Sequence, residues 1–99
     1  MRVYAIRSYA TNSILHEGYF PSFAACVEDA VQKRIDLGAA DFRNKNLTNT
    51  NLDDARMSAA DFTNSNLAGA NLSESALDRA IFQNASLHNI CLAFSSLVE

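Results

Sequence analysis

A period of five residues constrains the fold of this chain more than any other feature of its sequence. Every fifth position from Leu37 holds a large apolar residue, and nine of the ten leucines fall on this phase. The thirteen positions are Leu37, Phe42, Leu47, Leu52, Met57, Phe62, Leu67, Leu72, Leu77, Phe82, Leu87, Leu92 and Leu97. The positions two residues earlier are Ala, Ser or Thr in ten of thirteen cases. A period of five fits neither an α-helix nor a long strand, but it fits a short extended stretch followed by a turn.

The position between these two registers predicts the turns. It is Asp or Asn in seven of thirteen cases, namely Asp36, Asp41, Asn46, Asn51, Asp61, Asn66 and Asn71. These residues favour turns because their side chains bond nearby backbone groups. A longer period of twenty is present at Phe42, Phe62 and Phe82 and at Asn44, Asn64 and Asn84. We therefore expect coils of four pentapeptides, with stacked phenylalanines inside and an outward ladder of hydrogen-bonded asparagines.

Three segments carry the pattern A-(D/N)-L-x-x most cleanly: Ala40-Asp41-Phe42, Ala60-Asp61-Phe62 and Ala70-Asn71-Leu72. This pattern resembles that of the pentapeptide-repeat family, and the resemblance covers residues 35–99. It implies a mainly β fold, namely a right-handed quadrilateral β-helix of thirteen pentapeptides.

Two departures from the repeat predict irregularities. Lys45 occupies an inward position, and a buried unpaired ammonium group is costly, so we expect a local distortion or a side chain that escapes outward. After Ser75 the Asp/Asn position loses these residues. The last coil is therefore less strictly specified, and we expect Ile81 and Phe94 to be exposed there.

Residues 1–34 predict a hairpin followed by a helix. Strands are expected over 2–8 and 14–20, and a helix is expected to begin after Ser22 and to carry Lys33 and Arg34 in its last turn. The helix has one apolar face: Phe23, Cys26, Val27, Ala30 and Val31. We expect this segment to cap the open end of the repeat and to form one folding unit with it. In an alternative interpretation the hairpin, with Tyr4, Tyr9 and Tyr19, binds a partner itself.

The chemistry-bearing residues match no catalytic or metal-binding pattern. His16 and His88 have no ligand at metal-binding spacing, and each is expected to be a solvated surface side chain. Cys26 and Cys91 are expected to be free thiols of a reducing cytoplasm. The sequence has no glycine-rich phosphate loop and no run of eighteen apolar residues. We expect a cytoplasmic protein that is no enzyme, binds no cofactor or metal, and does not cross a membrane.

The distribution of charged residues predicts that the binding surface lies on the repeat. Residues 35–99 hold eight carboxylates against four basic residues, a net charge of −4, so we expect a basic partner and no direct binding to nucleic acid. Spacing by twenty predicts two acidic columns, Asp41 with Asp61 and Asp54 with Glu74. The favoured face joins Asp53 to the second column, because no basic residue is expected to share that face. The secondary candidates are Asp41, Asp61 and Asp36.

The family resemblance implies more about function. Members with assigned roles often mimic DNA and occupy a basic DNA channel, and the best known protect DNA gyrase. Small phage-encoded members include an inhibitor of the type I-C CRISPR system. The resemblance implies a non-enzymatic inhibitor that blocks DNA binding by a type I-C Cascade complex in a bacterial host cell. Two alternatives are a gyrase-binding protein and a protein-interaction scaffold without mimicry.

The C-terminal end of the repeat is expected to be open. No helix or polar cap follows the last coil, so apolar side chains such as Leu92, Phe94 and Leu97 are expected to be available for contact. We expect a monomer or a weak homodimer that associates through its C-terminal coils.

Overall fold

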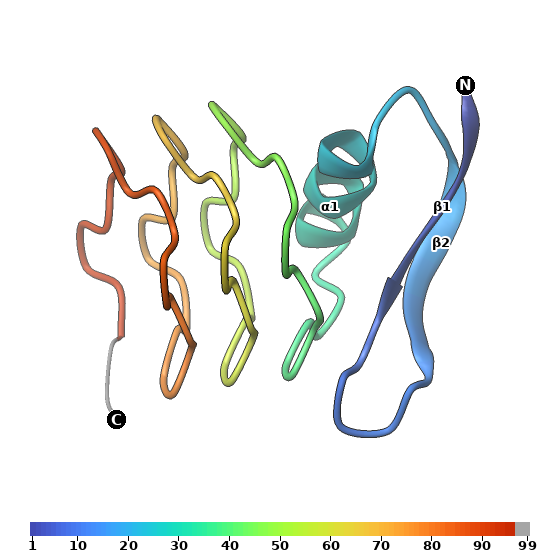
Figure 1. Cartoon of the computed structure of the whole chain (residues 1–99), viewed down its shortest axis with the longest axis horizontal. Helices are drawn as coiled ribbons and strands as arrows, with labels where there is room; N and C mark the ends of the chain where they lie inside the picture. The colour runs from blue at the N-terminus through green and yellow to red at the C-terminus, as the bar shows by residue number, and fades with distance from the viewer. Residues whose placement is uncertain (97–99) are drawn as a thin grey trace.

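The computed structural model describes residues 1–96 of the 99-residue chain. Its first three elements are the strands β1 (Arg2–Arg7) and β2 (Ile14–Phe20) and the helix α1 (Phe23–Gln32). The rest of the chain winds in stacked coils, and α1 lies between these coils and the hairpin (Figure 1). Leu97, predicted to lie at the open end, is outside the described residues.

The hairpin is an antiparallel pair of strands with an irregularity between Ile6 and Arg7. The range predicted for the second strand, 14–20, is confirmed, whereas the first strand ends one residue earlier than predicted. Ser8, the residue after β1, forms an antiparallel bridge to Ala40 of the first coil. The hairpin is thus joined to the repeat by backbone pairing as well as by side chains.

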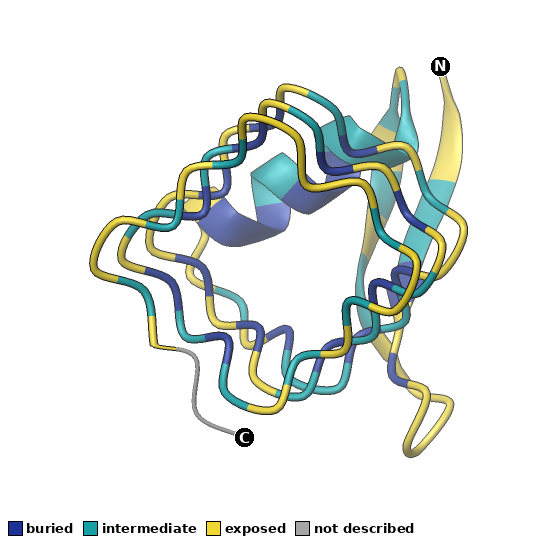
Figure 2. Cartoon of the chain, turned by 60° about the vertical axis from the view of Figure 1, so that its left-hand side comes forward, coloured by how far each residue is buried: buried dark blue, intermediate teal, exposed yellow. Residues whose placement is uncertain are grey.

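Helix α1 covers the end of the first coil (Figure 2). It begins where predicted, since the Ser22 hydroxyl accepts a hydrogen bond of 3.1 Å from the amide of Ala25. The residues that it buries are Cys26, Val27, Ala30 and Val31, as its periodicity indicates. The placement of Lys33 and Arg34 in the last turn is wrong, because the helix ends at Gln32. Lys33 is the C-cap, and Arg34 turns the chain into the first coil with a φ of 60°.

The coil of twenty residues is confirmed by backbone pairing. Nine parallel bridges, from Asp36–Arg56 to Ala76–Ser96, each join residues twenty apart. Amide hydrogen bonds run between neighbouring coils, for example from Phe42 to Asp61 at 2.9 Å and from Asp61 back to Ala40 at 3.0 Å. The repeat therefore has a β-helix-type fold made of short bridges rather than long strands. Its right-handedness stays a prediction.

Turn chemistry recurs along the coils. All seven predicted Asp and Asn side chains accept a hydrogen bond from the amide two residues on: Asp36, Asp41, Asn46, Asn51, Asp61, Asn66 and Asn71. Every fifth residue from Arg34 to Phe94 has a positive φ, and we call these residues the corner positions. Twelve of the thirteen are not glycine.

The predicted asparagine ladder is wrong. Asn44, Asn64 and Asn84 occupy corner positions, with φ values of 58–61°. Among residues 1–96 no side-chain hydrogen bond joins them to one another. Asparagine suits these positions because it tolerates the left-handed conformation better than most residues do.

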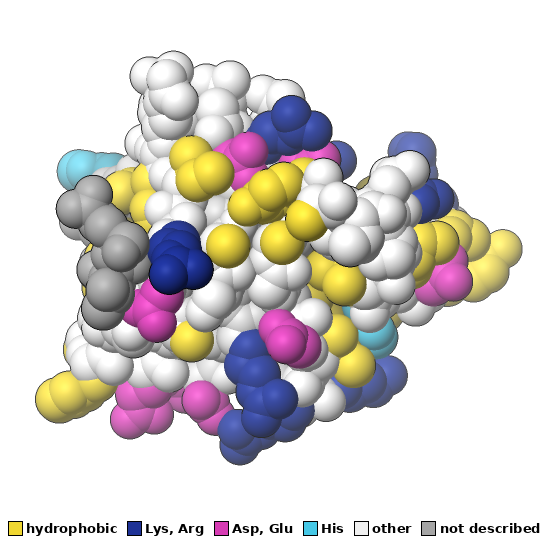
Figure 3. All heavy atoms as spheres, turned by 90° about the horizontal axis from the view of Figure 1, so that it is seen from below, with side chains coloured by type: hydrophobic (Ala, Val, Ile, Leu, Met, Phe, Trp, Pro, Cys, Tyr) yellow, Lys and Arg dark blue, Asp and Glu magenta, His cyan; other side chains and the backbone are white. Residues whose placement is uncertain are grey.

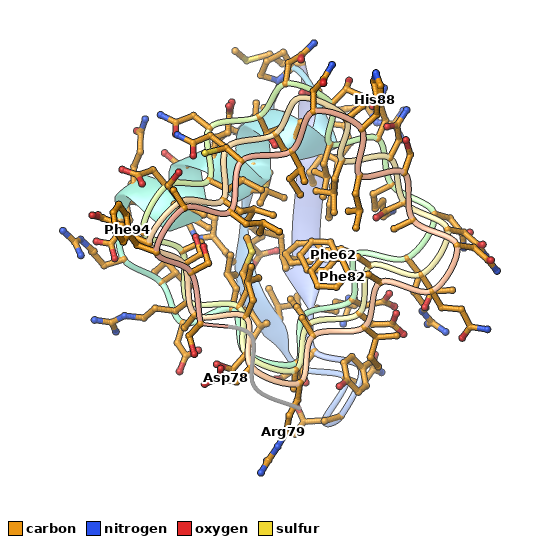
Figure 4. All side chains as sticks on the ribbon, turned by 90° about the vertical axis from the view of Figure 1, so that its left-hand side faces the viewer. Phe62, Asp78, Arg79, Phe82, His88 and Phe94 are labelled. Carbon is orange, nitrogen blue, oxygen red and sulfur yellow. The ribbon has the colours of Figure 1, made fainter. Side chains whose placement is uncertain are left out.

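The core is an aromatic column flanked by leucine columns. Phe42, Phe62 and Phe82 stack with ring centroids 5.1 Å apart, as their spacing predicted, and Figure 4 shows Phe62 and Phe82 inside the coils. The column continues into the cap, where Phe23 meets Phe42 edge-on at 6.2 Å and Tyr4 meets Phe23 at 6.4 Å. One continuous aromatic contact therefore joins hairpin, helix and repeat.

The backbone at Lys45 follows the repeat, whereas the Lys45 side chain points out of the core. The amide of Asn66 still donates to the Lys45 carbonyl at 2.9 Å, so no distortion of the coil is needed. The half-buried side chain reaches the cap, where Nζ lies 4.6 Å from the centre of the Phe23 ring. Of the two expected outcomes, the structure has the escape of the side chain.

The last described coil is less buried than the coils before it. No residue from Asp78 to Ser96 is buried, whereas all the earlier coils have buried inward positions. Ile81 and Phe94 are exposed, and Leu92 is half-buried.

We predict that Phe62→Ala lowers the free energy of unfolding by about 3–5 kcal/mol, because it opens a cavity in the middle of the aromatic column. The matched control is Phe94→Ala, which removes the same atoms from a side chain that is 90% exposed and should cost under about 0.5 kcal/mol. Urea unfolding measures both values, and equal costs would contradict the stacking described here.

We also predict that Ala59→Gly stabilises the fold by roughly 0.5–1 kcal/mol, because Ala59 is a corner position with a φ of 62° that glycine adopts without strain. Ala60→Gly, one residue on, should instead destabilise it by about 1 kcal/mol, since Ala60 is buried and has no positive φ. Thermal unfolding distinguishes the two, and a loss of stability in Ala59→Gly would argue against corner strain.

Candidate interaction surface

The favoured acidic residues lie along one column of corner positions. Arg34, Asp54, Glu74 and Phe94 follow one another at intervals of twenty, and all four have a positive φ. Each projects from the outside of a coil, and Figure 4 shows Phe94 pointing away from the core. The structure thus brings together Asp54 and Glu74, as predicted, and adds an aromatic ring to the same column.

A basic residue does share this face, contrary to the expectation. Arg34 forms an ion pair with Asp54 through Nη1 and Oδ2. The expectation counted only residues 35–99, but the end of α1 brings Lys33 and Arg34 onto the same face, one coil before Asp53 and Asp54. Within the described part of the chain, Asp53 and Glu74 form no ion pair. We define the corner face as Asp53, Glu74 and Phe94.

An exposed thiol lies next to the corner face. Ser73 Oγ and Cys91 Sγ are 3.0 Å apart, and this hydrogen bond is the main reason why the pKa of the Cys91 thiol is lowered. The carboxylate of Asp53 acts in the opposite direction. Cys26 is buried, and burial raises its pKa. Both cysteines are free, as expected.

The second acidic column is also partly neutralised. Asp41 and Asp61 are bridge partners on adjacent coils, as predicted. Arg43 binds Asp41 in a bidentate manner, with Nε–Oδ1 and Nη2–Oδ2 distances of 2.9 Å, and it holds the pKa of that carboxyl below its usual range. Asp61 accepts hydrogen bonds from the amide and hydroxyl of Thr63, and Asp36 accepts one from the amide of Gly38. On the face drawn in Figure 3, basic and acidic groups alternate, without a field of one sign.

The three tyrosines of the hairpin have different roles. Tyr4 belongs to the aromatic column, and the Tyr9 hydroxyl donates a 2.6 Å hydrogen bond to the carbonyl of Ala59, which ties the hairpin to the second coil. Tyr19 is 71% exposed and is the most accessible of the three. The hairpin therefore uses two tyrosines for docking onto the repeat.

The expectation that His16 is solvated is wrong. Its side chain is only 13% exposed, and Nε2 lies 2.8 Å from Oδ2 of Asp29 on α1. Lys33 Nζ lies 3.2 Å from the same oxygen. The hydrogen bond from His16 is the main reason why the pKa of Asp29 is lowered. The strand pattern could have indicated this contact, because His16 lies on the same side of β2 as Phe20, whose ring it approaches at 6.3 Å. His88 is exposed, as expected.

Residues 1–96 offer neither a metal site nor a membrane-spanning helix. This part of the chain contains no cluster of three or more His, Cys, Asp or Glu residues able to hold a metal ion. It also contains no helix with the length and apolar character that a membrane crossing requires.

The repeat matches a known sequence family. Residues 33–67 and 55–92 match the family model for pentapeptide repeats, with eight copies of the repeat. No curated protein matches the chain.

We predict that Asp29→Asn destabilises the protein near neutral pH and that this cost shrinks as the pH falls. The pKa of Asp29 is lower in the folded state, so its contribution is present above the unfolded value of about 3.9 and is lost as the pH falls through the folded value. Urea unfolding between about pH 6 and about pH 2.5 measures the effect. Asp53→Asn, the same substitution at an exposed residue without an ion pair, should have little effect throughout. A pH-independent cost for Asp29→Asn would contradict the charge interaction.

Proposed function

The chain belongs to the pentapeptide-repeat family, and on this basis we propose that it is a protein-interaction module that binds a partner protein through the outward side of its coils. Members of the family are generally structural or interaction proteins without enzymatic activity. The inward positions of the repeat are filled by apolar and small side chains, so the outer faces are the part of the repeat that is available for recognition.

The observation that carries this proposal is the position of Phe94. Its ring is 90% exposed, and its backbone has a φ of 62°, a conformation in which Asn or Gly is less strained. A large apolar side chain at such a position contributes nothing to the core of the repeat. Aromatic residues are enriched in the centres of protein interfaces, so a contact surface at Phe94 accounts for the residue.

The charges of the corner face indicate the chemistry of the partner. Asp53 and Glu74 form no ion pair within residues 1–96, and along the stack Glu74 lies one coil and Asp53 two coils before Phe94. A partner surface with Arg or Lys side chains beside an apolar patch would match both kinds of group. An Arg side chain could also lie over the Phe94 ring.

DNA mimicry is the second candidate, with the DNA channel of a type I-C Cascade complex or of gyrase as the partner. It is favoured by Asp36, Asp53, Asp61 and Glu74, which form no ion pair in the described part of the chain. It is weakened by the pairs Arg43–Asp41 and Arg34–Asp54, which neutralise two of the predicted carboxylates. The mimicry is therefore partial at most, and the corner face remains the stronger proposal.

The test measures binding of the purified protein to gyrase and to type I-C Cascade between about 50 mM and about 300 mM salt. Binding by mimicry should weaken steeply over this range, whereas a contact centred on Phe94, with only two carboxylates beside it, should weaken less steeply. Binding to neither complex would exclude both as partners.

We predict that Phe94→Asn weakens binding to the partner by at least about tenfold and leaves the melting temperature unchanged or higher, because Asn suits the corner conformation. Glu74→Gln should weaken binding by a few-fold and increase the salt tolerance of what remains. The matched control is Glu17→Gln on the hairpin, an identical substitution at an exposed residue outside the corner face. A loss caused by Glu17→Gln and not by the other two variants would move the contact to the hairpin.

A further inference from the structure

The cap and the first coil border an open cationic cavity that the corner face does not involve. It has a volume of about 370 Å³, and the residues of its wall that matter here are Ala5, Arg7, Phe23, Asp41, Arg43 and Lys45. Three cations and one carboxylate give this wall a formal charge of +2, although the whole chain carries −3. This part of the surface is therefore locally cationic and favours anions.

Backbone contacts between the hairpin and the first coil create this concentration. The amide of Asp41 donates a 2.8 Å hydrogen bond to the carbonyl of Arg7, at the end of β1. Arg7 is thereby fixed beside Arg43 and Lys45, which are more than thirty residues away in the sequence. Phe23, the first residue of α1, forms an apolar part of the wall. The cavity thus belongs to the junction of three segments, of which only the hairpin carries a net positive charge by itself.

The three cations of the wall differ in how many of their hydrogen-bond donors have an acceptor. Arg43 is occupied by its bidentate pair with Asp41. Arg7 donates through Nη1 to the carbonyl of Asn12 at 3.2 Å and keeps its other donors. Lys45 Nζ lies over the Phe23 ring, and in the part of the chain that the structure describes it has no carboxylate, carbonyl or hydroxyl acceptor. No side-chain nitrogen in the described part of the chain is both buried and without a partner, so Lys45 Nζ is accessible to solvent and can donate to a bound anion.

We propose that this cavity binds a phosphate monoester of a small ring compound. The phosphate accepts hydrogen bonds from Lys45 and Arg7, and the ring lies against the apolar wall formed by Ala5 and Phe23. A phosphate monoester carries a charge of about −1.5 to −2 at neutral pH, which matches the charge of the wall. A single carboxylate would leave about one positive charge uncompensated. The cavity volume also lies in the range of small-molecule sites, and it exceeds what a bare phosphate ion fills.

The experiment titrates the whole protein with phenyl phosphate, inorganic phosphate and benzoate, and follows the amide resonances of Ala5, Arg7, Asn44 and Lys45. We expect saturable shifts at these residues, with phenyl phosphate binding more tightly than inorganic phosphate and benzoate binding least. Binding of phenyl phosphate should also strengthen as the pH rises through about 6, where the second ionisation of the phosphate occurs.

Substitutions decide whether the cavity is the site. Lys45→Met and Arg7→Gln should each weaken binding of phenyl phosphate by about tenfold, the loss expected for one charge-assisted hydrogen bond. Arg56→Gln is the matched control, because Arg56 is an exposed cation of the coils outside this cavity. An equal loss in Arg56→Gln would show general attraction of anions and overturn the proposal. Tighter binding of benzoate, or the absence of saturable shifts, would overturn it as well, and Arg7→Gln retains the test if Lys45→Met does not fold.

Discussion

The stacking of inward side chains at intervals of twenty residues is the contact on which the rest of this structure depends. Within the repeat, each coil bonds to the coils beside it, so its stability depends on its neighbours. Phe62 has such a neighbour on both sides, whereas Phe82 has one, and no residue from Asp78 to Ser96 is buried. The first coil has a stacking partner on its outer side as well, because Phe23 and Tyr4 continue the aromatic column into α1 and the hairpin.

The same stacking organises the surface. A left-handed residue at every fifth position turns the chain and directs one side chain outward, so chemically related groups form columns across coils. Residues that are neighbours in such a column are twenty apart in the sequence. The column from Arg34 to Phe94 shows the consequence, since it begins at the end of the cap and contains an ion pair, a free carboxylate and an exposed ring.

The two proposed binding regions lie at different ends of the stack and differ in charge. The corner face ends at Phe94 in the last described coil, whereas the cationic cavity lies where the hairpin and α1 meet the first coil. In the described part of the chain, the corner face contains carboxylates without ion pairs and an aromatic ring. The cationic cavity contains more cations than carboxylates. Since no residue is common to both, substitutions can separate an effect on a protein partner from an effect on a small anion.

The sequence by itself determined the features that recur at fixed intervals along the chain. The period of five placed the inward side chains and all seven Asp and Asn turns, the period of twenty predicted the phenylalanine stack, and helical spacing identified the buried face of α1. Only the tertiary structure decided how the cap meets the repeat: His16 with Asp29, Arg34 with Asp54, and Lys45 over Phe23. Periodicity relates residues only within one element. The hairpin, helix and coils have different periods, so the contacts between them depend on long-range packing that no single pattern encodes.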